Sequence, residues 1–171
     1  MRIFKEEQRF TQSWRIIIII LSMMVPLGII VGIYTTEPQR LSSLEFVLIA
    51  GLIILASGII FLFKLSSRID ELGIHYRFFP FHQNFKLIRW NEINSVYVRT
   101  YNAISEYGGW GLKGKIPWKK SKGAAINVSG NVGIQLELKN GKKILIGTKK
   151  QKEAKATLET YKEKIIKSKH V

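Results

Sequence analysis

The sequence has no cysteine and is poor in the side chains that most catalytic and metal sites use. Without cysteine the chain forms no disulfide, which suits a reducing compartment. The only histidines, His75, His82 and His170, lack the spacing of metal ligands. Paired carboxylates for acid–base catalysis would come from Glu92 and Glu106, but no sequence pattern brings these two together. We therefore predict a non-enzymatic protein with no catalytic residue, no metal and no cofactor.

A complete phosphate-binding loop is also missing, although one stretch begins like one. Residues 106–118 read EYGGWGLKGKIPW, and from Gly109 they match G-x-x-x-x-G-K. In a phosphate-binding loop the lysine precedes a Ser or Thr that holds magnesium, and a helix follows. Here Lys115 precedes Ile116 and Pro117, which supply neither the hydroxyl nor a helix start. Nucleotide binding is therefore not expected.

Charge is absent from two long apolar segments. Residues 16–34 and 46–63 contain no Asp, Glu, Lys or Arg. At about 1.5 Å per helical residue, each segment approaches the roughly 30 Å thickness of a bilayer core. A cleaved signal peptide is a poorer interpretation of the first segment, because its apolar run is too long and a second run follows closely. The sequence predicts a transmembrane helical hairpin over residues 16–63.

The distribution of basic residues predicts the orientation of this hairpin. The tail at residues 1–15 holds four Lys or Arg, the connection at 35–45 holds only Arg40, and 22 follow Phe63. Because positive charge is retained on the cytoplasmic side, both termini are expected there, in an integral protein of the cytoplasmic (inner) membrane.

Small residues on the two apolar segments suggest close helix packing. The first contains a G-x-x-x-G pattern, Gly28 to Gly32, and the second has Gly51 and Gly58 seven residues apart. Glycines allow two helix backbones to approach closely in a membrane. We expect them to pack the two helices of one hairpin together, while a homodimer remains the alternative.

Residues 64–171 are strongly basic and are long enough for one small cytoplasmic domain. They hold 22 Lys and Arg against 8 Asp and Glu, a net charge of +14. Alternating apolar residues predict a β-hairpin over 132–148, with Asn140-Gly141 in a type I′ turn. Similar patterns predict about seven antiparallel strands in all. The other predicted strands are 67–70, 73–79, 85–90, 95–101 and 124–128.

The end of the chain predicts a helix over residues 149–168. Thr148 and Gln151 fit a capping box at its start. One apolar stripe follows at helical spacing, formed by Ala154, Leu158, Tyr161 and Ile165. The expected fold class is thus a membrane α-helical hairpin plus an all-β (α+β) barrel, partly open and capped by a C-terminal α-helix.

Three stretches resemble a known family. They are EYGGWGLKG at 106–114, GNVGIQLELKNGKKILIGT at 130–148, and the WNEI corner at 90–93. Together with the apolar hairpin, they resemble small bacterial membrane proteins that carry a pleckstrin-homology-like (PH-like) domain. The resemblance implies a PH-like fold, a membrane location and a role as an anchored protein-binding or assembly module, without catalytic residues.

The loop at residues 103–123 is the predicted binding surface. Its candidate residues are Tyr107, Trp110, Lys113, Lys115, Trp118, Lys119, Lys120 and Lys122. Its structural glycines, expected to allow tight or positive-φ backbone, are Gly108, Gly109, Gly111 and Gly114. The loop could contact a protein partner or anionic lipid headgroups, or its tryptophans could fold back onto the barrel. Nucleic acid is not expected, because no recognition helix is evident and a nearby membrane explains the basic charge.

Overall fold

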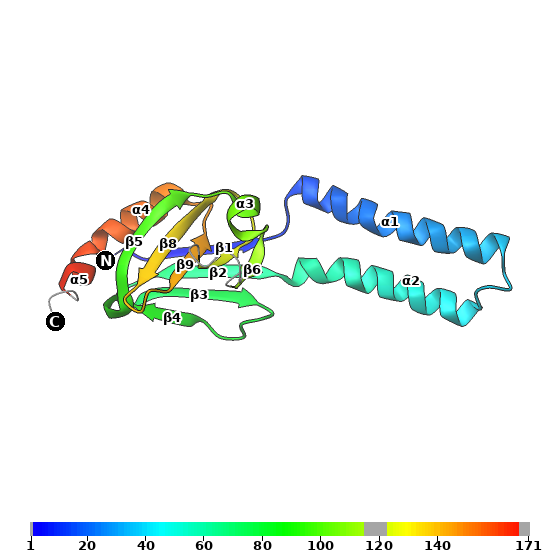
Figure 1. Ribbon diagram of the computed structural model, residues 1–171, viewed down its shortest axis with the longest axis horizontal. Coiled ribbons are helices and arrows are strands. Elements are labelled where there is room, and N and C mark those ends of the chain that lie inside the picture. The colour runs from blue at the N-terminus through cyan, green and yellow to red at the C-terminus, as the bar shows by residue number, and fades with distance from the viewer. Residues whose placement is uncertain (1, 115–122, 168–171) are drawn as a thin grey trace. The chain divides into compact units, whose positions relative to one another are not determined.

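The structure is a computed structural model that describes residues 2–114 and 123–167. The chain divides into two compact units, shown in Figure 1. The helical unit is Phe10–Phe63, and the sheet unit combines Met1–Arg9 with Lys64–Val171. The helical unit is therefore an insertion within the sheet unit, after its first strand.

The two predicted apolar helices are confirmed. They are α1, Ser13–Thr36, and α2, Ser43–Gly58, which the 3₁₀ turn η1, Ile59–Leu62, prolongs. Both are long and apolar enough to cross a membrane, by length and composition. Helix α1 continues through Pro26 without a break. Helix α2 begins with a capping box between Ser42 and Glu45.

Aromatic side chains make contacts at both ends of the helical unit, whereas the predicted packing glycines make none between its helices. Tyr34 of α1 stacks on Phe46 of α2, with ring centroids 4.6 Å apart, and its hydroxyl lies 3.0 Å from the Ser43 hydroxyl. At the other end, Phe10 and Phe63 meet edge to face. A Cβ atom built on any of the four predicted packing glycines meets no heavy atom within 4 Å. The close approach expected at Gly28, Gly32, Gly51 and Gly58 is therefore not made between α1 and α2.

The first sheet of the sheet unit, sheet A, is antiparallel with the order β1-β2-β3-β4. Its strands are β1, Phe4–Arg9; β2, Lys64–Ile69; β3, Gly73–Phe79; and β4, Lys86–Arg89. Strand β1 corrects the sequence-based expectation of a plain N-terminal tail. Its register places Arg9 opposite Lys64, so the strands before and after the helical unit pair with each other.

The second sheet, sheet B, has the order β5-β8-β9-β7-β6. Its strands are β5, Ile93–Thr100; β6, Gly111–Lys113; β7, Ala124–Asn127; β8, Val132–Leu138; and β9, Lys143–Gly147. A 3₁₀ turn, η2, Trp90–Glu92, precedes β5. Because β7 pairs with β9 in parallel, the expectation of an entirely antiparallel arrangement is wrong. The described strands form two separate sheets and no closed barrel, within a fold of the expected α+β class.

The β8–β9 hairpin is confirmed, but its predicted turn type is wrong. Gly141 has a φ of +77°, whereas Asn140 has no positive φ. The Leu138 N–H donates to the Lys142 carbonyl at 2.8 Å, which closes a three-residue loop instead of a two-residue type I′ turn. The Asn140 side chain accepts a hydrogen bond from the Lys142 N–H, which favours this longer loop.

The C-terminal helix is found, but it is broken at Tyr161. Helix α4 is Gln151–Thr160 and helix α5 is Lys162–Lys167. The predicted apolar stripe is buried in full: Ala154, Leu158, Tyr161 and Ile165. Tyr161 stacks on Trp90 at 5.2 Å and donates its hydroxyl proton to the Arg2 carbonyl at 2.8 Å. The helix therefore covers the sheets and also holds the N-terminal segment.

Buried polar side chains of β1 join the two sheets. The Glu6 carboxylate accepts hydrogen bonds from the Thr148 hydroxyl at 2.5 Å and from the Lys149 N–H at 2.8 Å. The Gln8 amide donates to the Gly147 carbonyl at 2.9 Å. The predicted capping box with Gln151 is absent, because Thr148 is engaged by Glu6 and accepts from the Lys150 N–H. The strand that precedes α1 is thus fixed to the end of β9.

We predict that Glu6→Ala lowers the free energy of unfolding of the sheet unit by about 1–3 kcal/mol, because it leaves buried donors without their acceptor. Glu7→Ala is the matched control, since Glu7 faces the solvent and pairs with Lys64 there. Urea unfolding of the full chain in mild detergent, followed by near-ultraviolet circular dichroism, measures both. Equal effects of the two substitutions would contradict the role given to Glu6.

Asp70 organises the turn between β2 and β3. Its carboxylate accepts hydrogen bonds from the Leu72 N–H at 2.9 Å and from His75 at 3.1 Å, and it pairs with Arg68 at 2.7 Å. Burial alone would raise the pKa of Asp70, but these partners outweigh it and hold that pKa below its ordinary value.

The lowered pKa of Asp70 predicts a specific loss of stability in acid. The carboxyl group has a lower pKa in the folded chain than the roughly 3.9 of an unfolded one. Its contribution is therefore present at neutral pH and is lost as the pH falls below about 4, through the folded pKa. Asp70→Asn should flatten this acid limb in thermal unfolding curves recorded across pH. An unchanged limb would show that Asp70 does not cause it.

Candidate functional site

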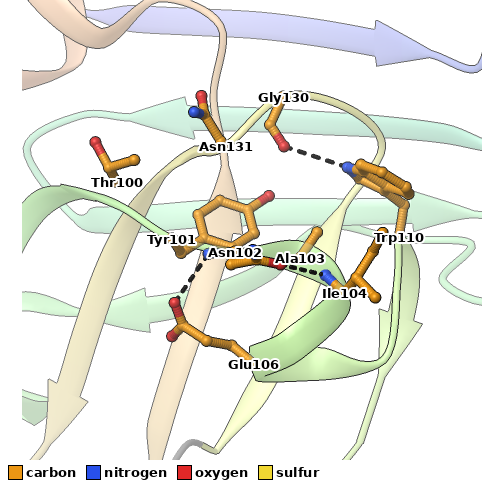
Figure 2. A pocket seen from close by; sticks show the side chains of 9 residues that line it. All are labelled: Thr100, Tyr101, Asn102, Ala103, Ile104, Glu106, Trp110, Gly130 and Asn131. Atoms are coloured by element: carbon orange, nitrogen blue, oxygen red, sulfur yellow. Dashed lines mark hydrogen bonds between the residues drawn. The ribbon is translucent and has the colours of Figure 1, made fainter.

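A pocket of about 540 Å³ lies beside the short helix α3, Ala103–Tyr107, which connects β5 to β6. Figure 2 shows its wall, built from the end of β5, helix α3, the residue before β6 and the turn before β8. The lining residues are Thr100, Tyr101, Asn102, Ala103, Ile104, Glu106, Trp110, Gly130 and Asn131. Part of the predicted surface, residues 103–123, therefore forms one side of a pocket.

Local hydrogen bonds fix both ends of α3. The Asn102 side chain accepts from the N–H groups of Ile104 and Ser105 at 3.0 and 2.9 Å, which caps the first turn. The Glu106 carboxylate reaches back and accepts from the Asn102 N–H at 2.9 Å. At the other end Gly108 is left-handed, with a φ of +72°, and its N–H donates to the Ile104 carbonyl.

The expected backbone of the loop glycines is confirmed at three of four positions. Gly108, Gly109 and Gly111 have φ values of +72°, +117° and +118°, in the region that disfavours side chains. Gly114 is not among the positive-φ glycines. These conformations let the chain leave α3, turn and enter β6 within a few residues.

An ion pair between β5 and α3 supports the pocket wall. The Arg99 guanidinium donates to the two carboxylate oxygens of Glu106 at 3.3 and 2.9 Å, and to the Tyr107 hydroxyl at 3.1 Å. Its Nε donates to the Gln135 side chain of β8. Burial opposes the charge on Arg99, but the bond to Glu106 prevails and raises the pKa of the guanidinium. Arg99 therefore stays charged and holds α3 against sheet B.

Tyr107 and Trp110 both pack into the protein core, but Tyr107 is more deeply buried than Trp110. Tyr107 is only 2% exposed, so its assignment to the binding surface is corrected: it supports the wall from behind. Burial raises the pKa of its phenol, which stays neutral. Trp110 is half-buried against the cluster of Tyr101, Ala103, Tyr107, Ala125 and Leu145. Its indole N–H donates to the Gly130 carbonyl at 3.2 Å, as drawn in Figure 2.

The basic part of the predicted surface is described only at Lys113, which lies on β6 and is partly exposed. The other basic and aromatic candidates, Lys115, Trp118, Lys119, Lys120 and Lys122, lie outside the described residues. In the described ranges, 2–114 and 123–167, no group of three or more His, Asp or Glu side chains could hold a metal ion.

Most of the pocket wall is polar but uncharged. It offers the amides of Asn102 and Asn131, the hydroxyl of Thr100 and the apolar Ile104, which is 65% exposed. Among the residues that the structure describes, its lining includes no lysine or arginine, and Glu106 contributes a carboxylate. Such a wall suits a ligand with amide groups and apolar side chains better than an anion.

Sequence reasoning missed the residues that come from elsewhere in the fold, namely Arg99, Asn102 and Asn131. Asn102 is a residue type that favours the N-cap position of a helix, and this signal could have revealed α3. No local signal links Asn131 to this site, because the β5–β8 pairing brings it there: the Tyr101 N–H donates to the Asn131 carbonyl at 2.7 Å.

Comparison with protein-family models, curated proteins and solved structures finds no match to this chain. Function is therefore inferred from the residues and their geometry.

We predict that Arg99→Met destabilises α3 and the pocket wall by about 1–3 kcal/mol, because Glu106 loses its charged partner in a half-buried site. Amide hydrogen exchange should accelerate over residues 102–109 in the full chain. Lys143→Met is the matched control, since it breaks the more exposed pair with Glu137 on the same sheet. Unchanged exchange over α3 in Arg99→Met would contradict the supporting role of this ion pair.

Proposed function

We propose that the protein is a non-enzymatic module, anchored in the cytoplasmic membrane, that binds a segment of a partner protein in the pocket beside α3. The main support for this proposal is a pocket whose walls are fixed by hydrogen bonds and whose lining suits a polypeptide. Recruitment or assembly of the partner at the cytoplasmic face is the function that follows.

Three features support anchoring with both termini in the cytoplasm. Helices α1 and α2 have the length and composition of membrane spans. The pairing of β1 with β2 requires the two ends of the helical unit to lie on one side of the membrane that it crosses. The single basic residue of its connecting turn, Arg40, favours the cytoplasm for the other, strongly basic side.

We further propose that the α+β sheet unit has a PH-like architecture. Two sheets and a C-terminal helix with a buried apolar stripe are the parts that such a domain needs. The resemblance in residues 106–114 and 130–148 is the further support for this proposal. On this proposal the family's role as an anchored binding module extends to this chain.

The lining favours a peptide over a lipid headgroup. A phosphate would require cations, yet the nearby Arg99 is engaged by Glu106, and no lining residue within 2–114 and 123–167 is basic. Asn102 and Asn131 can pair with backbone amides, and Ile104 can cover an apolar side chain. Strand β6, at the edge of sheet B beside Trp110, can add a partner strand. The lysines at positions 113–122 would attract an acidic segment and an anionic lipid surface alike, so they do not decide between the two.

Photo-crosslinking in native membranes tests this function. A photoreactive residue at Ile104 of the full chain should give an adduct with one defined protein. The same residue at Leu72, equally exposed on the β2–β3 turn, should not give that adduct. Asn131→Ala should weaken it several-fold, because that amide lines the pocket.

Two results would overturn the proposal. Adducts with lipid alone at Ile104 would favour the alternative, in which the region reads anionic headgroups. Identical protein adducts at Ile104 and Leu72 would show that the pocket selects no partner.

A further inference from the structure

The end of β3 and its connection to β4 expose an unusual amount of aromatic surface. Residues 78–85 read FFPFHQNF, and we call them the phenylalanine loop. Phe79, Phe81 and Phe85 are 42%, 62% and 46% exposed. Three exposed phenylalanines within seven residues form the kind of apolar patch that marks a binding or membrane surface.

The register of sheet A places this loop at the end of the sheet where the chain passes to the helical unit. Phe79 pairs with Lys64, which directly follows the last residue of the helical unit. Lys64 in turn pairs with Arg9, which directly precedes that unit. The opposite end of the sheet carries the Asp70 turn. Figure 1 shows the loop as the long connection that extends beyond β3 and β4.

The loop is held in shape by its own buried residues. Phe81 stacks on Phe78, which is 1% exposed, with the two rings nearly parallel and their centroids 6.0 Å apart. The His82 N–H donates to the Phe78 carbonyl at 2.8 Å, and the His82 ring packs edge-on against Tyr76. Burial, together with Lys86, lowers the pKa of His82, so no charge resides within this turn at neutral pH. The exposed phenylalanines are therefore presented by an ordered loop.

Cations surround the loop on the same end of the sheet. Arg77 lies over the Phe85 ring, with its guanidinium carbon 4.9 Å from the ring centroid. Exposed Lys86 begins β4, and exposed Arg9 ends β1. The neighbouring acid, Glu7, is paired with Lys64 at 2.7 Å. Phenylalanine flanked by Arg and Lys is the composition that binds an anionic membrane interface, with rings at the acyl boundary and cations among headgroups.

We propose that the phenylalanine loop inserts Phe79 and Phe81 into the interface of the same bilayer that α1 and α2 cross. Arg9, Arg77 and Lys86 then lie against anionic headgroups. The inserted rings form a third attachment point, which restrains the sheet unit against the leaflet. This inference rests on the proposed membrane anchoring, but it is independent of any partner in the pocket.

The depth of the loop can be measured directly, because the natural chain has no cysteine and any introduced one is unique. The full chain is reconstituted in nanodiscs of phosphatidylcholine and phosphatidylglycerol, with a nitroxide label on Phe81→Cys. Collisional relaxation by oxygen, which partitions into lipid, and by a water-soluble nickel chelate reports depth. We expect nickel accessibility at position 81 to be several-fold lower than at Leu72→Cys, on the opposite end of the sheet.

One further label and a set of serine substitutions keep the outcome decisive. Leu55→Cys, on the exposed face of α2, reports the anchor itself and should be shielded from nickel. In the chain labelled at position 81, Phe79→Ser with Phe85→Ser should restore nickel accessibility, whereas Leu72→Ser should not. Position 81 as accessible as position 72, with position 55 shielded, overturns the loop proposal and leaves the anchor intact. Nickel access at position 55 overturns the anchor on which the proposal rests.

Discussion

The pairing of β1 with β2 is the constraint on which the rest of the structure depends. These strands are adjacent in sheet A, although residues 10–63 separate them in the chain. A flexible insertion of that length would add entropy to the closure of the sheet. A helical hairpin reduces this cost, because its own folding brings its two ends together. The Tyr34–Phe46 stack near the connecting turn and the Phe10–Phe63 contact at the base hold the hairpin closed.

Once β1 is in place, it organises both ends of the remaining chain. Glu6 and Gln8 reach the end of β9 and the start of α4, and the Arg2 carbonyl accepts from Tyr161. These bonds also explain why sequence reasoning missed the strand. The inward-facing residues of β1 are Phe4, Glu6 and Gln8. Because two of these are polar, the strand lacks the alternation of apolar and polar residues that predicts a half-buried strand. Their hydrogen-bond partners are supplied only by the folded chain. By contrast, β8 places Ile134 and Leu136 inward and was predicted.

In the candidate site, too, some features could be predicted from single residues and others depend on how the strands pair. Local signals predicted the positive-φ glycines 108, 109 and 111 and the place of Trp110 in the candidate site, because backbone freedom and aromatic area are properties of single residues. They could not predict that Tyr107 is buried, which depends on its packing against Ala125 of β7 and Leu145 of β9, or that Asn131 completes the wall, which depends on the β5–β8 register. The parallel pairing of β7 with β9 could not be predicted for a similar reason. The alternation along a strand indicates which face of the sheet each side chain lies on, but not the direction in which the neighbouring strand runs.

The two proposed surfaces constrain each other. Gln8, one residue before the end of β1, donates to the Gly147 carbonyl, and Gly147 pairs with Gly133 at the end of sheet B that carries the pocket. The pocket and the phenylalanine loop therefore lie toward the same end of the sheet unit, the end through which the chain continues into α1 and α2. With the loop in the headgroup region, only a segment that itself runs close to the leaflet can reach the pocket. On these two proposals together, the partner that reaches the pocket is itself a membrane-associated protein.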